Sequence, residues 1–184
     1  MALEHAILVS LSERAASGLD LTRRFDKSIG YFWTASHQQI YRTLSRMEKD
    51  GWVRSEVVAQ QGRPDKKVYD VTAAGREELG RWLAAPTPAQ PLRSELMVKF
   101  RAASYGDREQ VLDLARAKLA EHRDLLALYE GIEQRDFPKP DGLAGRELDM
   151  YLVLRGGVRM EQFWIDWLTE YLDAHTRAHT KDER

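Results

Sequence analysis

Side chains suited to reading DNA bases gather in one short polar segment that begins at Ser36. Glutamine can hydrogen-bond to adenine through two atoms, and arginine can do the same with guanine. Gln38 and Arg42 stand four residues apart, so a helix would present both on one face. A second basic group surrounds a Gly-Arg-Pro turn, and thin cationic loops of this kind can bind phosphates. The candidate DNA contacts are Ser36, His37, Gln38, Gln39, Tyr41, Arg42, Ser45, Arg63, Lys66 and Lys67.

These polar residues need a helix to position them, and the surrounding sequence predicts one. Ser36 followed by Gln39 is a capping box, in which each side chain satisfies a backbone N–H at the start of a helix. Asp50-Gly51 is typical of a helix end, because glycine readily takes the left-handed conformation. The inward stripe of the predicted helix consists of Ile40, Leu44 and Met47.

Two earlier helices and a following hairpin complete the pattern of the N-terminal half. Residues 3–11 show helical apolar spacing, and residues 17–25 begin with a helix-capping pair. Residues 53–59 and 68–71 are rich in β-branched side chains and predict a hairpin with a basic tip. Thr72 would cap a fourth helix, whose predicted inward residues are Leu79, Trp82 and Leu83. This order of elements is that of a winged helix-turn-helix domain, which reads the major groove with its third helix.

The remainder of the chain predicts a second, helical domain behind a linker. Residues 86–91 hold three prolines, which cannot continue a helix, so we place the domains at residues 1–85 and 92–184. The expected fold class is therefore mainly α with a small β-hairpin. The last predicted helix, from about residue 147 to 173, is apolar on more than one side. Such a helix needs cover on nearly all sides, which a second copy of the chain could supply.

Aromatic side chains of this last helix allow two interpretations, a dimer interface or a pocket for a small effector. The pair Gly156-Gly157 indicates either a close approach of helices across the dimer or a kink beside a cavity. The candidate interface or pocket residues are Tyr151, Phe163, Trp164, Trp167, Leu168 and Tyr171.

Composition and charge exclude several classes of protein. The chain has no cysteine, no catalytic set that we can identify, and a net charge of −1, although residues 36–67 carry a local excess of basic side chains. His175 and His179 share a helical face, but they lack a third metal ligand. We therefore expect no enzyme activity, no cofactor and no metal. Without an apolar run of about 18 residues or a signal peptide, we expect a cytoplasmic protein with no membrane partner.

Four segments, in this order along the chain, resemble the PadR family of bacterial transcription regulators. They are residues 36–44 (SHQQIYRTL), 48–53 (EKDGWV), 62–69 (GRPDKKVY) and 72–76 (TAAGR). The helical C-terminal half resembles the branch with a virulence-activator type of dimerisation domain.

The resemblance implies a specific mode of action. Family members form dimers through the C-terminal helices, often repress neighbouring genes, and in some cases respond to small aromatic compounds. The family's tyrosine in the recognition helix corresponds to Tyr41, and its basic wing to Arg63, Lys66 and Lys67. Residues 37–39 depart from the small residues or proline of many members, so we expect this branch to read different bases.

The sequence thus predicts a transcriptional repressor that binds a pseudo-palindromic DNA operator as a homodimer, tuned by a small aromatic effector. The alternative is a dimeric module that binds a ligand or a protein and whose winged helix no longer reads DNA. The coincidence of Gln38, Arg42 and the basic turn on one surface favours the first hypothesis.

Overall fold

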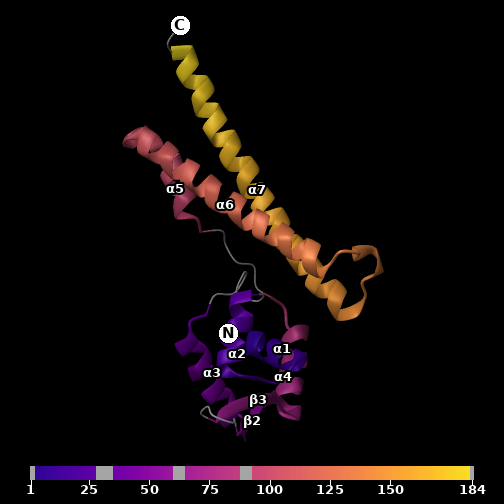
Figure 1. Ribbon diagram of the computed structural model, residues 1–184. Coiled ribbons are helices and arrows are strands. Elements are labelled where there is room, and N and C mark those ends of the chain that lie inside the picture. Colours follow the sequence, from indigo (N-terminus) through magenta and orange to yellow (C-terminus); the bar gives the residue numbers. More distant parts are fainter. Residues whose placement is uncertain (1–2, 28–34, 60–64, 88–92, 183–184) are drawn as a thin grey trace. The chain divides into compact units, whose positions relative to one another are not determined.

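Two units of the chain, Met1–Gln90 and Pro91–Arg184, each have their own internal packing (Figure 1). The structure is a computed structural model that describes residues 3–27, 35–59, 65–87 and 93–182, with side chains up to residue 177. Two sequence features, the aromatic residues 31–33 and Arg63 at the predicted wing tip, lie outside these ranges.

Helices and a small sheet alternate in the N-terminal unit as the sequence predicts. The described elements are α1 (Leu3–Glu13), β1 (Ala16–Ser17), α2 (Gly18–Lys27), α3 (His37–Lys49), β2 (Val53–Val58), β3 (Lys66–Val71) and α4 (Ala73–Ala84). The sheet is antiparallel, and its described strands have the order β1-β3-β2. The winged-helix prediction is confirmed, but β1 was not foreseen, because two residues are too few to show a strand pattern.

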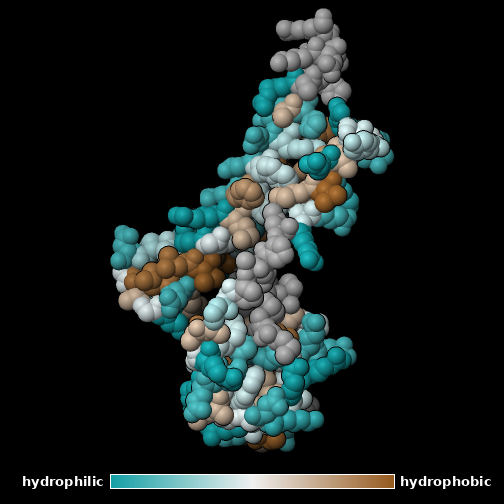
Figure 2. Space-filling model, turned by 180° about the vertical axis from the view of Figure 1, so that it is seen from behind, coloured by the Kyte–Doolittle hydropathy of each residue, from teal (hydrophilic) through white to brown (hydrophobic). Residues whose placement is uncertain are grey.

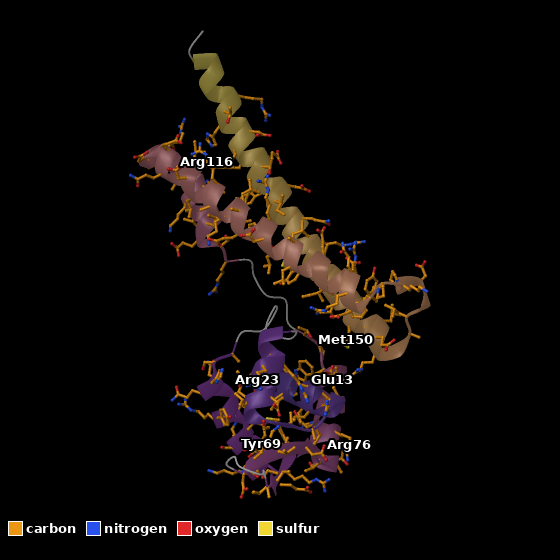
Figure 3. The ribbon with its side chains drawn as sticks, viewed as in Figure 1. Glu13, Arg23, Tyr69, Arg76, Arg116 and Met150 are labelled. Atoms are coloured by element: carbon orange, nitrogen blue, oxygen red, sulfur yellow. The ribbon has the colours of Figure 1, made fainter. Side chains whose placement is uncertain are left out.

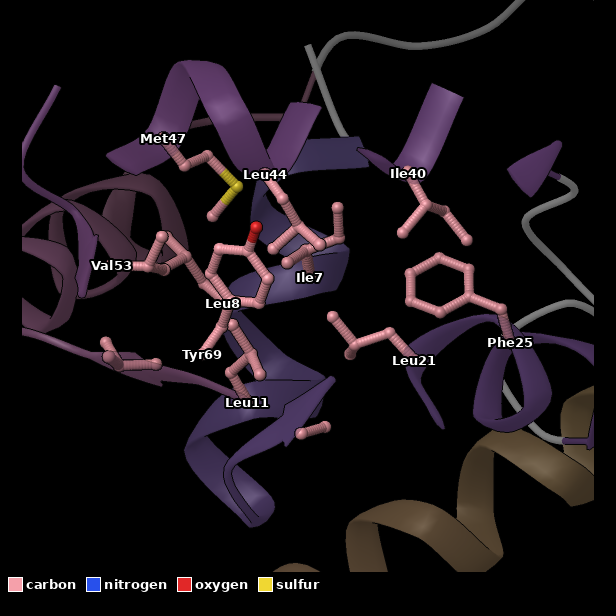
Figure 4. Packing of buried hydrophobic residues seen from close by; sticks show 12 residues of the cluster. Ile7, Leu8, Leu11, Leu21, Phe25, Ile40, Leu44, Met47, Val53 and Tyr69 are labelled. Carbon is pink, nitrogen blue, oxygen red and sulfur yellow. The ribbon is translucent and has the colours of Figure 1, made fainter. Parts of the chain in front are cut away.

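One core ties the three helices of the winged helix-turn-helix to its sheet (Figure 4). The α3 residues that were predicted to point inward are fully buried, as is the apolar face of α1. Figure 4 shows these residues together with others of the same core. The labelled ones are Ile7, Leu8, Leu11, Leu21, Phe25, Ile40, Leu44, Met47, Val53 and Tyr69. Because α3 uses this face for the core, its opposite face is left for a ligand.

Hydrogen bonds at the helix starts hold these elements in register. Gln39 N–H donates to Ser36 Oγ over 3.2 Å, and Ser36 N–H donates to Gln39 Oε1 over 2.8 Å, which confirms the capping box. Ser17 and Asp20 form the same reciprocal pair at the start of α2. Gly51 ends the α3 region with a φ of 74°, the left-handed conformation that its sequence position predicts.

Helix α4 corrects one prediction about the core. Leu79 is partly buried against the core, but Trp82 lies at the surface and Leu83 is 67% exposed, so the inward prediction is wrong for both. The ring of Trp82 stacks on His5 at 4.5 Å between centroids. Within the described part of the N-terminal unit, the last turn of α4 therefore meets α1 through Trp82 and His5, while Leu83 is left exposed.

A long helical hairpin forms the C-terminal unit. Its elements are α5 (Glu95–Arg101), η2 (Ala103–Tyr105), α6 (Arg108–Asp136), η3 (Pro140–Gly142) and α7 (Gly145–Asp182). Asp107 caps α6 as predicted, accepting from the N–H groups of Glu109 and Gln110. Helix α7 is longer than the sequence pattern indicated, and it packs along α6 around Phe100, Ala115, Leu119 and Leu168.

Gly157 marks the place where α6 and α7 come close together. A Cβ atom at this position would lie 3.1 Å from the ring of Tyr129 on α6. The close approach is therefore within one chain, and α7 runs through both glycines as one helix. Nothing lies within 4 Å of the corresponding position at Gly156, so of these two glycines it is Gly156 that faces open space.

Candidate nucleic-acid interface

The outward face of α3 carries the polar side chains that the sequence singled out. Ser36, His37, Gln38 and Gln39 are exposed at its first turn, and Arg42 and Ser45 follow on the exposed side. The buried stripe on the other side keeps this face turned outward. The structure thus brings seven of the ten candidate residues, including Tyr41, together on one helix.

Gln39 has a structural task in addition to any contact with DNA. Its side-chain oxygen accepts the Ser36 N–H, so this oxygen is occupied by the helix cap. The adjacent Gln38 has no such partner among the described residues. Of the two glutamines, Gln38 is therefore the better candidate for a two-point contact with a base.

Tyr41 joins the two helices of the helix-turn-helix. Its ring lies directly over Gly18, where a Cβ atom would come within 2.4 Å of the Tyr41 Cε1 atom. The side chain remains 45% exposed, so its hydroxyl is accessible while the ring covers the start of α2. A side chain at position 18 would have to displace the Tyr41 ring, and sequence reasoning did not foresee this contact.

The two lysines of the predicted wing point to opposite faces of β3, as successive residues of a strand must. Lys66 Nζ lies 2.7 Å from Asp20 Oδ2 on α2, and Lys67 Nζ lies 2.8 Å from Glu48 Oε2 on α3. The hydrogen bond from Lys66 lowers the pKa of Asp20, and the one from Lys67 lowers the pKa of Glu48. Both lysines are thus already paired in the free protein, which sequence reasoning did not anticipate.

Glu48 connects the recognition helix to both strands of the wing. Its carboxylate accepts hydrogen bonds from Ser55 Oγ on β2 and Lys67 Nζ on β3. The ammonium group of Lys67 also lies 5.1 Å from the centre of the Tyr69 ring. Hydrogen bonding to Glu48 raises the pKa of Lys67, so the pair is ionised across the neutral range. Glu48 therefore sets the position of the wing relative to α3.

We expect Glu48→Gln to lower the free energy of unfolding by less than about 1 kcal/mol at pH 7, because both partners are partly exposed. The folded-state pKa of Glu48 is lowered, so its stabilising effect is present above the carboxyl's unfolded pKa and is lost as pH falls through the folded value. The difference from wild type should therefore shrink on acidification below pH about 4.5.

Urea unfolding of both proteins between pH 7 and pH 3 measures this difference. Glu56→Gln on β2 is the matched control, since Glu56 is exposed and has no partner among the described residues. A difference between wild type and Glu48→Gln that stays constant over this pH range would contradict the prediction.

The aromatic residues of α7 divide between two places. Trp164 contacts Phe163 and Trp167, and Phe100 of α5 contacts Trp167 and Tyr171. Tyr151 instead contacts Phe137, so it stands apart from the cluster in which the sequence placed it. Leu168 is fully buried within its own chain, where it packs with Phe100, Ala115 and Leu119.

Sequence reasoning also missed a hydrogen bond between a histidine and a glutamate next to these rings. His122 Nδ1 lies 2.5 Å from Glu161 Oε2, and the His122 ring stacks on Trp164 with an interplanar angle of 7°. Glu161 is buried between α6 and α7. The two residues are 39 positions apart and lie on different helices. Helical periodicity relates only residues of the same helix, so the sequence could not predict this contact.

Neither a metal centre nor a membrane-spanning helix is found in the described part of the chain. Among residues 3–27, 35–59, 65–87 and 93–182, no three His, Asp or Glu side chains are grouped so that they could hold a metal ion. No helix there has both the length and the apolar character needed to cross a membrane.

Comparison with known proteins identifies the family. Residues 7–81 match the transcriptional regulator PadR-like family, and residues 92–176 match the virulence activator alpha C-terminal domain. The probable transcriptional regulator Rv1176c of Mycobacterium tuberculosis is 53% identical over 184 residues, covering 95% of this chain and 97% of that protein. This chain belongs to the PadR-like family. Its relatives are transcriptional regulators and not enzymes.

Solved structures of family members have the same fold. The Vibrio cholerae virulence activator AphA has a TM-score of 0.80 and 36% identity, covering 96% of this chain and 99% of its own. Bacillus subtilis PadR, solved in complex with operator DNA, has a TM-score of 0.84 and 28% identity, covering 95% and 99%. A structure of PadR with p-coumaric acid has a TM-score of 0.79 and 27% identity, covering 95% and 98%.

Proposed function

We propose that this regulator is a homodimeric repressor that reads a pseudo-palindromic operator with α3 and the β2–β3 wing. In this proposal residues 1–85 bind DNA, residues 86–91 link the two domains, and residues 92–184 form the dimer. The observation that carries the proposal is the exposed polar face of α3, whose capped first turn presents Gln38 above Arg42.

One relative supports the repressor assignment. Bacillus subtilis PadR is named a negative transcriptional regulator and is 31% identical over 179 residues, and its structure has been solved with operator DNA. A repressor needs only to occupy its operator so that polymerase is kept away. A two-fold dimer places two recognition helices on DNA, so its operator has matching half-sites.

An exposed apolar stripe on α7 supports the dimer. Val153, Gly156, Met160 and Phe163 follow the three- and four-residue spacing by which packed helices meet. Met160 is 60% exposed and Phe163 is 54% exposed, although both are large and hydrophobic. Figure 2 shows hydrophobic side chains gathered along one face of the C-terminal unit. We propose that the same stripe of a second copy covers this face.

A small aromatic compound is the proposed effector. The structure of PadR with p-coumaric acid shows that one relative binds such a molecule. In this chain the rings of Phe163, Trp164 and Trp167 offer stacking surfaces on α7. An effector changes regulation only when it binds two arrangements of the dimer with different affinity.

Replacing the two proposed reading residues tests the function. We expect Gln38→Ala and Arg42→Ala each to weaken operator binding by about 1–3 kcal/mol, because each removes a two-point contact with a base. Fluorescence anisotropy with DNA from upstream of the gene measures the affinity. Arg101→Ala, an exposed arginine on α5 without a partner among the described residues, is the control for loss of charge.

The outcome separates this proposal from its alternative. If both α3 variants bind DNA as the control does, the winged helix does not read DNA through this face. The module that binds a ligand or a protein would then be the better description.

A further inference from the structure

A basic pocket opens on the N-terminal unit between the end of α1, the start of α2 and β3. Its volume is about 520 Å³, and the charged residues that line it are Arg14, Asp20, Arg23, Arg24 and Lys66. Four of these five side chains are cationic, so the pocket has a strong excess of positive charge. None of them lies on α3, so the pocket is separate from the reading face described above.

Arg24 holds the backbone on one side of this pocket in place. Its Nη1 donates to the carbonyl oxygens of Ser10 over 3.0 Å and Arg14 over 2.7 Å, and its Nη2 donates to that of Ala15 over 3.3 Å. These bonds tie the end of α1 to α2 and satisfy carbonyls that the helix end leaves open. The backbone that carries Arg14 is therefore held in place before any ligand arrives.

Arg14 and Arg23 are the two pocket residues whose guanidinium groups are available to bind a ligand. Lys66 pairs with Asp20 at 2.7 Å, so these two charges largely offset each other. The exposed guanidinium groups of Arg14 and Arg23 have no hydrogen-bond or ion-pair partner in the part of the chain that is described. Figure 3 labels Arg23 on α2.

We propose that this pocket binds a phosphate group through Arg14 and Arg23, and that the phosphate belongs to the DNA backbone beside the wing. The planar guanidinium group matches the oxygens of phosphate and can donate two N–H bonds to them at once. Lys66 is the first residue of β3, at the end of the hairpin where its strands are joined, and its neighbour Lys67 reaches α3. Because Lys66 and Val68 of β3 line the pocket, it borders the wing on the side turned away from Lys67, and a duplex bound to the wing would present its backbone there. The assignment to DNA rests on the proposed function.

Salt dependence of DNA binding tests this contact directly. Each phosphate contact adds about 0.9 to the slope of log affinity against log salt concentration. The proposed homodimer has two such pockets, each binding one phosphate, so we expect Arg14→Gln/Arg23→Gln to reduce this slope by about 2 relative to wild type, without changing the preference between sequences. Arg123→Gln on α6 should leave the slope unchanged, because it removes one exposed charge from the other unit.

A random-sequence duplex at low salt is used alongside the upstream DNA, because a backbone contact does not depend on base sequence. Circular dichroism melting checks that the double variant is folded. Wild-type protein that binds neither duplex overturns the proposed function itself. Equal slopes for wild type and the double variant, with both binding DNA, overturn the pocket inference alone.

Inorganic phosphate distinguishes the two sources of this group. ³¹P NMR titration of the full chain, without DNA, detects binding of the free anion. Saturable binding that the double variant loses, together with an unchanged salt slope, overturns the assignment to the DNA backbone. A reduced slope with only weak, non-saturating binding of free phosphate supports it.

Discussion

Replacing Gly75 by alanine is expected to destabilise the N-terminal unit by about 1–3 kcal/mol, at the upper end of the cost of overpacking. A Cβ atom there would lie 2.1 Å from the carbonyl oxygen of Trp52, which is backbone and cannot rotate away. The same oxygen accepts the Thr72 N–H over 3.0 Å and the Thr72 hydroxyl over 3.1 Å. Moving it would therefore also disturb the cap of α4.

Gly80 offers a matched control in the same helix. Nothing lies within 4 Å of a Cβ atom at this position, so Gly80→Ala should raise the free energy of unfolding by about 1 kcal/mol through helix propensity alone. Hydrogen exchange of the α4 and β3 amides in the full chain reports on both variants. Similar protection in Gly75→Ala and wild type would show that α4 can move away from Trp52 without loss.

Met160→Glu is expected to convert the proposed dimer into monomers. It places a charge in the middle of the apolar stripe on α7, where a partner helix would have to bury it. Because a dimer holds two half-sites at once, its loss should weaken operator binding by about 100-fold or more. Analytical ultracentrifugation gives the mass, and anisotropy gives the affinity. Met150 of the same helix is labelled in Figure 3.

Two controls isolate the effect of the stripe. Leu83→Glu adds the same charge at an exposed apolar residue on α4 and should leave the dimer intact. Met160→Leu keeps the apolar character and should also remain dimeric. A wild-type chain that sediments as a monomer at micromolar concentration would overturn the proposed interface.

Local signals in the sequence were sufficient to predict most of the winged helix-turn-helix. The capping box at Ser36, the spacing of Ile40 and Leu44, and the glycine at position 51 all act within a few residues of one another. Capping and helical periodicity are short-range effects, so the sequence shows them directly. For the same reason, the exposed face of α3 could be predicted before its neighbours were known.

Some predictions failed where a local pattern depended on a distant element. Trp82 and Leu83 have the types expected of an inward face, but in the described N-terminal unit Trp82 lies at the surface and Leu83 is exposed. Tyr151 stands apart from the other α7 rings because it meets Phe137 instead. A helical pattern predicts which residues share a face, and it does not say what packs on that face.

By itself, the sequence determined the helices, their caps, the apolar faces and the family. Only the tertiary structure decided which charges meet: Lys66 with Asp20, Lys67 with Glu48, and the group of arginines around the α1–α2 pocket. Ion pairs and close backbone contacts, such as Gly75 against Trp52, depend on distances between residues far apart in the chain. Those distances are set by the packing of whole elements, which residue spacing along the chain does not encode.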